Sequence, residues 1–397
     1  MSTVAPSDSQ REDLLASADD LGRRCAARSK EIEANRFLPQ DLAEALAGAR
    51  LYRMLTPREY GGLEVSVETF VEVIERLASY EASAAWCTFI DCTACILAAY
   101  LPNEGASELF SNPQLKAAGV FAPRGKATRE VRDGVPGFRI SGRWAWGSAS
   151  KNADIVLGGC MVLNEQGKPE ILPDGFTRVQ MMVFRRDQVT WLNNWDTFGL
   201  RGSGSGEFEV HDVFVAEHHS ASLTDDEPLP RTLYRFPAFG LLGIGVGAVA
   251  LGIARHALDS LCDLAKVRTP QFSGKTLDQR PGTQQAIAKA EAGLRSARAF
   301  LMESVRQAWN EAEQQGVIAL EKRRDIRLAT TYAVEIARNI VTSMYQLGGG
   351  SSIFDSSPLQ QCLRDIHVVT QHFMVSESTY EVVGRLFLGL DTNVSMF

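Results

Sequence analysis

Residues 195–206 read WDTFGLRGSGSG, and the run EFEVHDVFV follows them at residues 207–215. Glycines alternate with small and aromatic residues in the first run, which predicts a tight loop rather than a helix. The second run is rich in β-branched and aromatic residues, which predicts a strand. The stretch therefore places β-structure in the middle of the chain.

The residues around this stretch continue the same pattern. Short segments rich in β-branched and aromatic residues are separated by Gly, Pro, Asn and Asp, which is typical of an antiparallel barrel or sandwich. The strand-like segments are residues 116–121, 135–146, 155–162, 178–184, 189–195 and 206–215.

Helical periodicity dominates both ends of the chain. We expect helices at 11–35, 39–49, 66–80 and 83–100, and again at 236–267, 282–315, 320–347 and 358–388. Four long helices with short connections indicate a four-helix bundle. The prediction is an α+β protein with three domains: an N-terminal helical domain (1–114), a middle antiparallel β-barrel domain (115–226) and a C-terminal helical bundle (227–397).

Composition excludes several classes of partner. The 397 residues are 45% hydrophobic and 22% charged, with a net charge of -7 and no Lys/Arg block. We therefore expect no binding to nucleic acid or to an anionic membrane surface. Seven scattered cysteines and an N-terminus without an apolar run fit a cytoplasmic protein. Cys92 and Cys95 form a single C-x-x-C within an apolar region, and we interpret them as buried structural thiols.

One segment is long enough to raise the question of a membrane. Residues 236–254 carry no charge over 19 positions, but they include Pro237 and five glycines. We interpret the segment as a buried bundle helix whose small residues let another backbone or a flat ligand come close.

Two further motifs complete the pattern. RWAWGSASKNAD stands at 143–154, and QLGGGSS at 346–352 is followed by PLQQCLRD at 358–365. Together with the run at 195–206, in this order and spacing, they resemble the acyl-CoA dehydrogenase family over nearly the whole chain. That resemblance implies the helix–barrel–bundle architecture and a homotetramer.

The catalytic base of the dehydrogenases is missing. The resemblance implies a catalytic Glu eight residues after Asp365. In this sequence that position is Phe373. The alternative Glu position falls within residues 241–251, which contain no acid. Abstraction of a proton beside a thioester needs a positioned base. Glu377 would serve only if the helix register shifted.

His372, preceded by Arg364 and Asp365, instead resembles the flavin-dependent monooxygenase branch of the family. The resemblance implies the oxygenase component of a two-component system, which takes reduced flavin (FMN ahead of FAD) from a separate reductase. It implies O2 as co-substrate and a small aromatic or indole-like compound as substrate. The alternatives are an FAD-dependent acyl-CoA dehydrogenase, an N-oxygenase of an amino sugar and a non-catalytic flavin-binding protein.

Ser148 and His372 are the predicted catalytic residues. A hydroxyl at the flavin N5 could hold that atom's proton and slow the wasteful loss of hydrogen peroxide. A histidine titrates near working pH and could act as acid or base. Ser150 competes with Ser148 on what we expect to be the same strand face, and His367 competes with His372 on the final helix.

The predicted flavin-binding residues come from the same resemblance. Phe121 and Ala122, at the end of the first strand, would approach the flavin pyrimidine, and Trp146 would exclude water. Arg268 and Phe272 would contact the flavin of a neighbouring subunit. Backbone N–H groups near the glycine loop would bind phosphate. The full set is Phe121, Ala122, Trp146, Ser148, Arg268, Phe272, Gln346, Gly349 and Gly350.

Other conspicuous residues receive ordinary interpretations. His211, His218 and His219 follow a strand and are expected to be solvated, so no metal site is predicted. Trp86 and Trp191 are expected in the core.

Overall fold

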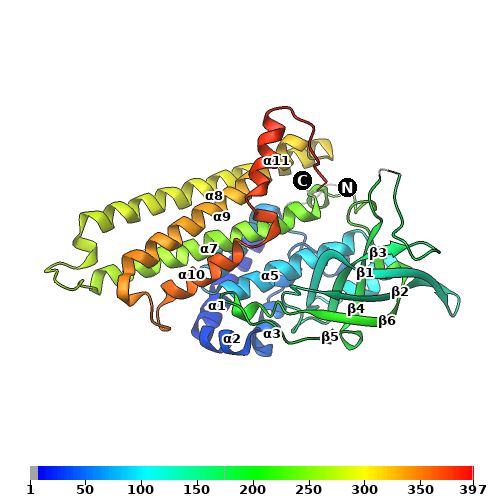
Figure 1. Cartoon of the computed structure of the whole chain (residues 1–397), viewed down its shortest axis with the longest axis horizontal. Coiled ribbons are helices and arrows are strands. Elements are labelled where there is room, and N and C mark those ends of the chain that lie inside the picture. Colours follow the sequence, from blue (N-terminus) through cyan, green and yellow to red (C-terminus); the bar gives the residue numbers. More distant parts are fainter. Residues whose placement is uncertain (1–7, 174, 396) are drawn as a thin grey trace.

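The computed structural model describes residues 8–173, 175–395 and 397. One helical part precedes the sheet in the chain and another follows it, and Figure 1 shows the sheet at the right-hand end of the molecule. The first part comprises α1 (Asp8–Ala27), α2 (Ser29–Asn35), α3 (Gln40–Gly48), α4 (Val67–Ala78), α5 (Ala82–Ala94) and α6 (Asn103–Phe110). The last comprises α7 (Ala238–Val267), α8 (Pro281–Gln315), α9 (Leu320–Gly348), α10 (Pro358–Val369) and α11 (Ser378–Phe387).

Helix α5 lies in the centre of the molecule. Glu81 caps it by accepting a hydrogen bond from the Ala84 N–H at 2.6 Å, which satisfies one of the free donors of the first turn. All of its residues are buried. The segment 82–99 and helix α7 are long and apolar enough to cross a membrane, yet 100% and 89% of their tested windows are buried inside the fold. Both therefore have the character of core helices.

The sheet has seven strands in the order β5-β6-β2-β1-β3-β4-β7. All paired neighbours are antiparallel except β1 and β3, which are parallel. The antiparallel barrel predicted from sequence was wrong in this respect: in the part of the chain that the structure describes, the sheet is mixed and ends at β5 and β7. The strands are β1 (Ala117–Arg132), β2 (Val135–Trp144), β3 (Ile155–Leu163), β4 (Val179–Arg185), β5 (Thr190–Trp191), β6 (Phe208–Ala216) and β7 (Ser220–Ala221).

The parallel pair follows from the connection after β2. Strands β1 and β2 form a hairpin, so β3 can reach the free edge of β1 only by a crossover. Residues 145–154 make that crossover, and they contain Ser148. Strand β1 runs well past its predicted end at residue 121, with a shift of register between Val120 and Gly125. Phe121 and Ala122 therefore lie at an irregularity inside the strand and not at its end.

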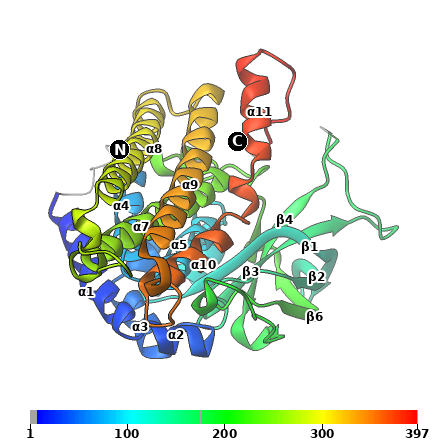
Figure 2. The ribbon, with the colours of Figure 1, turned by 60° about the vertical axis from the view of Figure 1, so that its left-hand side comes forward.

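The C-terminal helices pack side by side, as Figures 1 and 2 show. Helices α7 and α9 run parallel: Gly243 lies against Arg327 near their starts, and Gly348 lies against Leu264 near their ends. The prediction of a buried helix at 236–254 is confirmed, since residues 240–254 of α7 are all buried.

The single final helix predicted at 358–388 was wrong. Helix α10 ends at Val369 and α11 begins at Ser378. Between them His372 caps a short 3-10 helix, Phe373–Val375, because its Nδ1 accepts a hydrogen bond from the Met374 N–H at 3.3 Å. His372 therefore lies in a turn, where helical spacing does not fix its direction.

We expect two glycines of α7 to respond oppositely to alanine. A Cβ on Gly252 would lie 2.4 Å from the Glu75 carbonyl oxygen and 2.5 Å from Ala78 Cβ, whereas a Cβ on Gly240 would meet nothing closer than 3.8 Å. Gly252→Ala should lower the free energy of unfolding by roughly 1–3 kcal/mol. Gly240→Ala should leave the free energy of unfolding unchanged or raise it by up to about 1 kcal/mol. Chemical denaturation of both variants decides; equal stabilities would contradict the close approach of α4 and α7.

Candidate active site

The loop that carries Ser148 is fixed by the glycine-rich loop at 195–206. Gly147 N–H donates to the Gly206 carbonyl, and Ala149 N–H donates to the Ser203 carbonyl, both at 2.9 Å. A Cβ on Gly147 would lie 2.8 Å from the Phe208 ring. Ser148 and Ser150 thus belong to turns after β2, which corrects the expectation that they share a strand face.

Ser148 begins a chain of buried hydroxyl groups. Its side chain is 4% exposed, and its Oγ accepts a hydrogen bond from Trp86 Nε1 at 3.0 Å. The same Oγ lies 2.7 Å from Ser205 Oγ, which lies 2.7 Å from Ser203 Oγ. Ser203 Oγ donates to the Leu200 carbonyl at 2.7 Å. The rival Ser150 is also buried, but the Trp86 hydrogen bond goes to Ser148.

Trp86 connects Ser148 to the second predicted catalytic residue. Its ring and the His372 ring lie edge to face, with centroids 5.8 Å apart. Trp86 is 6% exposed, so the prediction of a core residue is confirmed. That prediction did not include its contacts with Ser148 and His372. A buried indole N–H needs an acceptor, so a Trp inside an apolar helix was the available signal.

His372 is neutral at physiological pH. Burial, followed by the positive charge of Arg327, lowers the pKa of His372 to about 4. Because Nδ1 accepts from Met374 N–H, the neutral ring carries its proton on Nε2. The side chain stays partly exposed and stacks on Phe373 at a centroid distance of 5.1 Å. His372 can therefore offer an Nε2–H to a ligand.

Arg364 and Asp365 hold this region together. Asp365 Oδ1 accepts a hydrogen bond from Leu200 N–H at 2.6 Å, and burial raises the pKa of Asp365 to about 7. Arg364 pairs with Glu33 at 2.8 Å and donates to the Phe198 carbonyl at 3.1 Å. The pair thus docks α10 on the glycine-rich loop. Arg201, in the same loop, donates to the Thr197 carbonyl at 3.3 Å.

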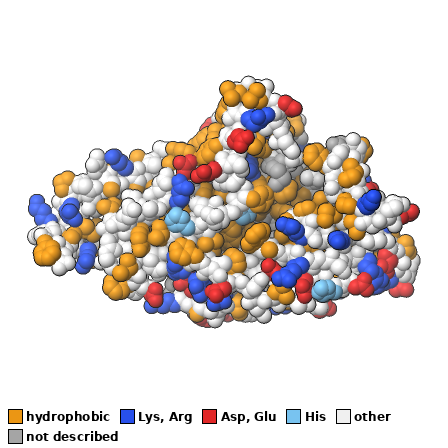
Figure 3. Space-filling view, in the orientation of Figure 1, with side chains coloured by type: hydrophobic (Ala, Val, Ile, Leu, Met, Phe, Trp, Pro, Cys, Tyr) orange, Lys and Arg blue, Asp and Glu red, His pale blue; other side chains and the backbone are white. Residues whose placement is uncertain are grey.

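The remaining predicted flavin residues fall into two groups. Phe121 is half-buried and meets Phe239 edge to face at 5.8 Å, while Ala122 and Trp146 are exposed. Trp146 is 71% exposed, and its φ of 63° is left-handed. Figure 3 shows hydrophobic side chains in the recess between the lobe of α11 and the sheet.

The second group lies at the other end of the bundle. Arg268 caps the end of α7, and Gln346, Gly349 and Gly350 lie at the end of α9. All four are exposed, and Phe272 is 99% exposed. The 21 residues of α7 between Gly243 and Leu264 span about 30 Å. A single chain therefore does not bring this group to Ser148 and His372, and Figure 1 shows the bundle projecting away from the sheet.

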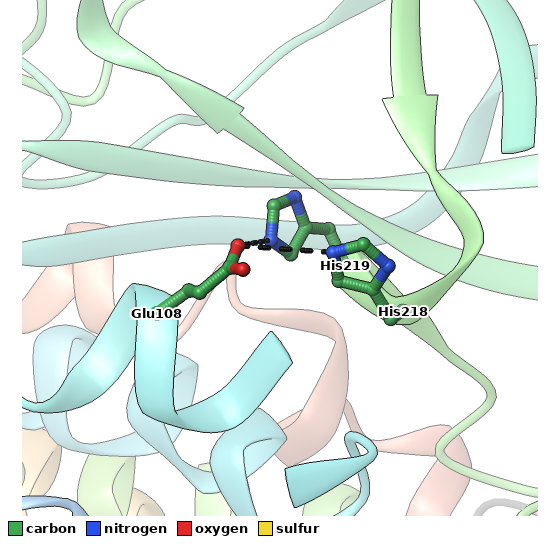
Figure 4. Close-up of side chains that lie close together, drawn as sticks. All are labelled: Glu108, His218 and His219. Atoms are coloured by element: carbon green, nitrogen blue, oxygen red, sulfur yellow. Dashed lines mark hydrogen bonds and ion pairs between the residues drawn. The ribbon is translucent and has the colours of Figure 1, made fainter. Parts of the chain in front are cut away.

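Two histidines predicted to be solvated converge on one carboxylate, as Figure 4 shows. His219 Nε2 lies 2.7 Å from Glu108 Oε2, and His218 Nε2 lies 3.7 Å from the same oxygen. Both rings are only partly exposed, which corrects the expectation. The contact ties the segment after β6 to α6. His211 lies apart and pairs with Glu209 at 3.1 Å.

A cavity of about 820 Å³ opens elsewhere, beside α6 and β4. Its lining includes Glu108, Arg186 and Trp191 but not Ser148, Trp86 or His372. Trp191, predicted in the core, is partly exposed and lies under the Arg186 guanidinium at 4.8 Å. We take Ser148 and His372 as the candidate active site, because the buried hydroxyl chain and the His372 ring both meet Trp86.

Comparison with known proteins identifies the family. Models of the acyl-CoA dehydrogenase N-terminal and C-terminal domains match residues 8–109 and 244–377. The indole-3-acetate monooxygenase of Pseudomonas putida is 35% identical over 370 residues, covering 93% of this chain and 92% of that one. The chain belongs to the acyl-CoA dehydrogenase family, in its flavin-dependent monooxygenase branch.

Two more relatives of this branch cover the chain almost completely. The indole-3-acetate monooxygenase of Acinetobacter baumannii is 29% identical over 385 residues, which are 95% of this chain and 94% of that one. The solved structure of XiaF from Streptomyces sp., in complex with FADH2 and glycerol, has a TM-score of 0.88 at 25% identity and covers 97% of both chains.

The candidate site of this chain differs from a dehydrogenase site in its catalytic base. Phe373 occupies the predicted Glu position and is 54% exposed. Glu377 is an exposed residue at the start of α11. In the turn between α10 and α11, His372 is thus the titratable residue that contacts Trp86.

We expect Ser148→Ala to keep the fold but to release more hydrogen peroxide per O2 consumed, because the hydroxyl next to Trp86 is lost. Ser150→Ala is the matched control, since Ser150 is equally buried in the same turn. Peroxide and O2 are measured with reduced flavin and substrate present. A wild-type yield in Ser148→Ala, or an equal rise in Ser150→Ala, would remove the role from Ser148.

The low pKa of His372 gives a prediction for stability. Between about pH 6.5, the ordinary value, and its folded pKa of about 4, the unfolded chain binds a proton that the folded chain does not. Stability therefore falls as the pH falls through this window. From pH 7 to pH 4.5 the wild type should lose about 1 kcal/mol more than His372→Gln, allowing for partial exposure. Parallel losses in thermal unfolding would contradict the lowered pKa.

Proposed function

We propose that this chain is the oxygenase component of a two-component system that hydroxylates a small aromatic or indole-like compound. The Ser148–Trp86–His372 constellation carries the proposal, because it lies beside Phe373, the residue at the position of the dehydrogenases' Glu base. The relatives named as indole-3-acetate monooxygenases support the substrate class.

The residues present fit a flavin. Exposed Trp146 and half-buried Phe121 offer flat apolar surfaces beside the loop that carries buried Ser148. A Cβ on Gly159 would lie 2.4 Å from the Phe121 carbonyl, so the β1 irregularity is held by close backbone packing. Phe121, Ala122, Trp146 and Ser148 would hold the ring. Reduced FMN or FAD bound there would supply the electrons that activate O2.

The protein's own groups then have defined tasks. Trp86 Nε1 occupies one lone pair of Ser148 Oγ and fixes the orientation of the hydroxyl. Ser148 can hold a proton at the flavin N5. His372 Nε2–H can donate to an oxygen atom of the substrate or of O2, since its Nδ1 is already occupied. Trp86 and Phe373 contact two sides of the imidazole and shield part of it from water.

The two distant groups of flavin residues indicate an assembly. We propose a homotetramer in which Arg268, Phe272, Gln346, Gly349 and Gly350 of one chain complete the flavin site of another. Large hydrophobic side chains are exposed at that end of the bundle, including Phe272, Ile353 and Phe354. Exposed apolar surface of this kind marks interfaces. A separate reductase would supply the reduced flavin, in the cytoplasm.

The test is incorporation of labelled oxygen. Purified protein, reduced flavin and an indole substrate are mixed with ¹⁸O₂, and the product is analysed by mass spectrometry. We expect one ¹⁸O atom in the product with either FMN or FAD, and titration with each reduced flavin shows which binds more tightly. Absence of label, together with bleaching of oxidised flavin by an acyl-CoA, would establish a dehydrogenase instead.

We expect His372→Ala to slow hydroxylation by roughly 10²–10⁴-fold, the usual effect of losing a general acid or base. His367→Ala is the control, because His367 lies on α10 outside the Trp86 contact. Single-turnover rates compare the two. Equal rates in both variants and wild type would exclude a catalytic role for His372.

We expect light scattering to give a mass near four chains. We also expect Arg268→Ala to weaken flavin binding by at least about 10-fold, because a charged contact with the flavin phosphate is lost. Lys266→Ala is the control, since Lys266 is also exposed and its partner is Asp263. A monomer that binds flavin tightly would contradict both the assembly and the role of Arg268.

A further inference from the structure

Arg327 is a buried cation for which the described residues provide no ion-pair partner. It lies on α9 and is 5% exposed. Its Nη1 lies 3.2 Å from Met374 Sδ, its Nη2 lies 3.5 Å from Thr379 Oγ1, and its Nε has no hydrogen-bond partner among the described residues. A thioether and a distant hydroxyl are weak acceptors for a group with five donors.

The unpaired charge is costly to the fold. Burial lowers the pKa of Arg327 to about 10, so the guanidinium remains protonated at neutral pH. Phe397 covers one side, with its ring centroid 5.5 Å away. Buried charges in proteins are ordinarily paired or neutralised. A bound anion would satisfy Arg327.

Its position joins it to the active site. Met374, which it contacts, is two residues after His372, and the charge of Arg327 acts on that histidine. The Nη1 atom lies 3.8 Å from where a Cβ of Gly243 would be. Gly243 is one helical turn after Phe239, whose ring meets Phe121. The guanidinium therefore lies beside the first turns of α7, behind the turn that carries His372.

We propose that Arg327 binds the carboxylate of an aromatic acid, so that the substrates of this enzyme are arylacetate-like anions; this inference rests on the proposed oxygenase function. The four-residue step from Phe239 to Gly243 rises about 6 Å along α7, which suits a ring near Phe239 and a carboxylate over Gly243. The forked donors of arginine match a carboxylate in geometry as well as charge. Met374 is flexible enough to move aside for it.

Two indole probes of equal size test the charge requirement. Indole-3-acetate and indole-3-acetamide are titrated into the anaerobic, flavin-loaded protein, and dissociation constants are measured. We expect wild type to prefer the acid by roughly 10–100-fold, as hydrogen bonds to charged groups allow. Arg327→Met should weaken binding of the acid by that factor and change binding of the amide less than about 3-fold. Arg327→Lys should keep part of the preference.

Arg323→Met is the matched control. Arg323 lies one turn earlier on α9. Its Nη1 donates a hydrogen bond to the main-chain oxygen of Phe397 at 3.3 Å, whereas the Met374 contact belongs to Arg327. It should keep the wild-type preference for the acid. Equal weakening of acid and amide in both Arg327 variants, or no preference in wild type, would overturn the proposal. Weaker binding of reduced flavin with unchanged binding of both indoles would also overturn it, because Arg327 would then serve a flavin phosphate.

The outcome is separable from that of the proposed function. If Arg327 is not the carboxylate site, wild type still incorporates ¹⁸O into the neutral amide. If the protein is not an oxygenase, no label appears in either probe, while the binding preference and its loss in Arg327→Met are still measured.

Discussion

The hydrogen bond from Trp86 Nε1 to Ser148 Oγ joins the parts of the molecule that form the site. Trp86 comes from the buried helix α5, and Ser148 comes from the crossover between β2 and β3. The indole ring also meets the His372 ring edge to face, and His372 comes from the turn after α10. One side chain thereby orients a hydroxyl and an imidazole that are 224 positions apart in the sequence. If this contact is lost, the Ser148 hydroxyl keeps the contact with Ser205, and His372 keeps the hydrogen bond from Met374 N–H and the stack on Phe373.

The contact depends on packing that begins far from it. Asp365 accepts a hydrogen bond from Leu200 N–H, and Ser203 donates to the Leu200 carbonyl. Ser205 then links Ser203 to Ser148 by hydrogen bonds between hydroxyl groups. On the opposite side, a Cβ on Gly245 would lie 2.5 Å from the Phe89 ring, and Phe89 packs edge to face on Trp86. The glycines of α7 therefore position the indole by letting α5 come close. Buried hydroxyl chains of this kind specify one arrangement because each member satisfies the next.

The order of helices, sheet and helices and the long apolar helix α7 could be predicted from the sequence, because periodicity is local. Short motifs likewise singled out Ser148 and His372, whose catalytic roles stay predictions. The parallel pairing of β1 with β3 could not, since pairing joins residues far apart in the chain. The helix break after Val369 depends on His372 capping Met374 rather than on Pro or Gly. Trp86 looked like a core residue because its acceptor lies 62 positions away. Arg327 gave no signal, as an unpaired charge is visible only once its neighbours are known.

A double-mutant cycle on Trp86 and Ser148 tests the central claim most directly. The quantity measured is hydrogen peroxide released per O2 consumed in wild type, Trp86→Phe, Ser148→Ala and the double variant. If the indole acts through the hydroxyl, Trp86→Phe raises the peroxide yield by itself, and the double variant is no worse than Ser148→Ala, which gives a coupling energy of about 0.5–3 kcal/mol. Independent, additive effects, or a wild-type yield in Trp86→Phe, would contradict the account.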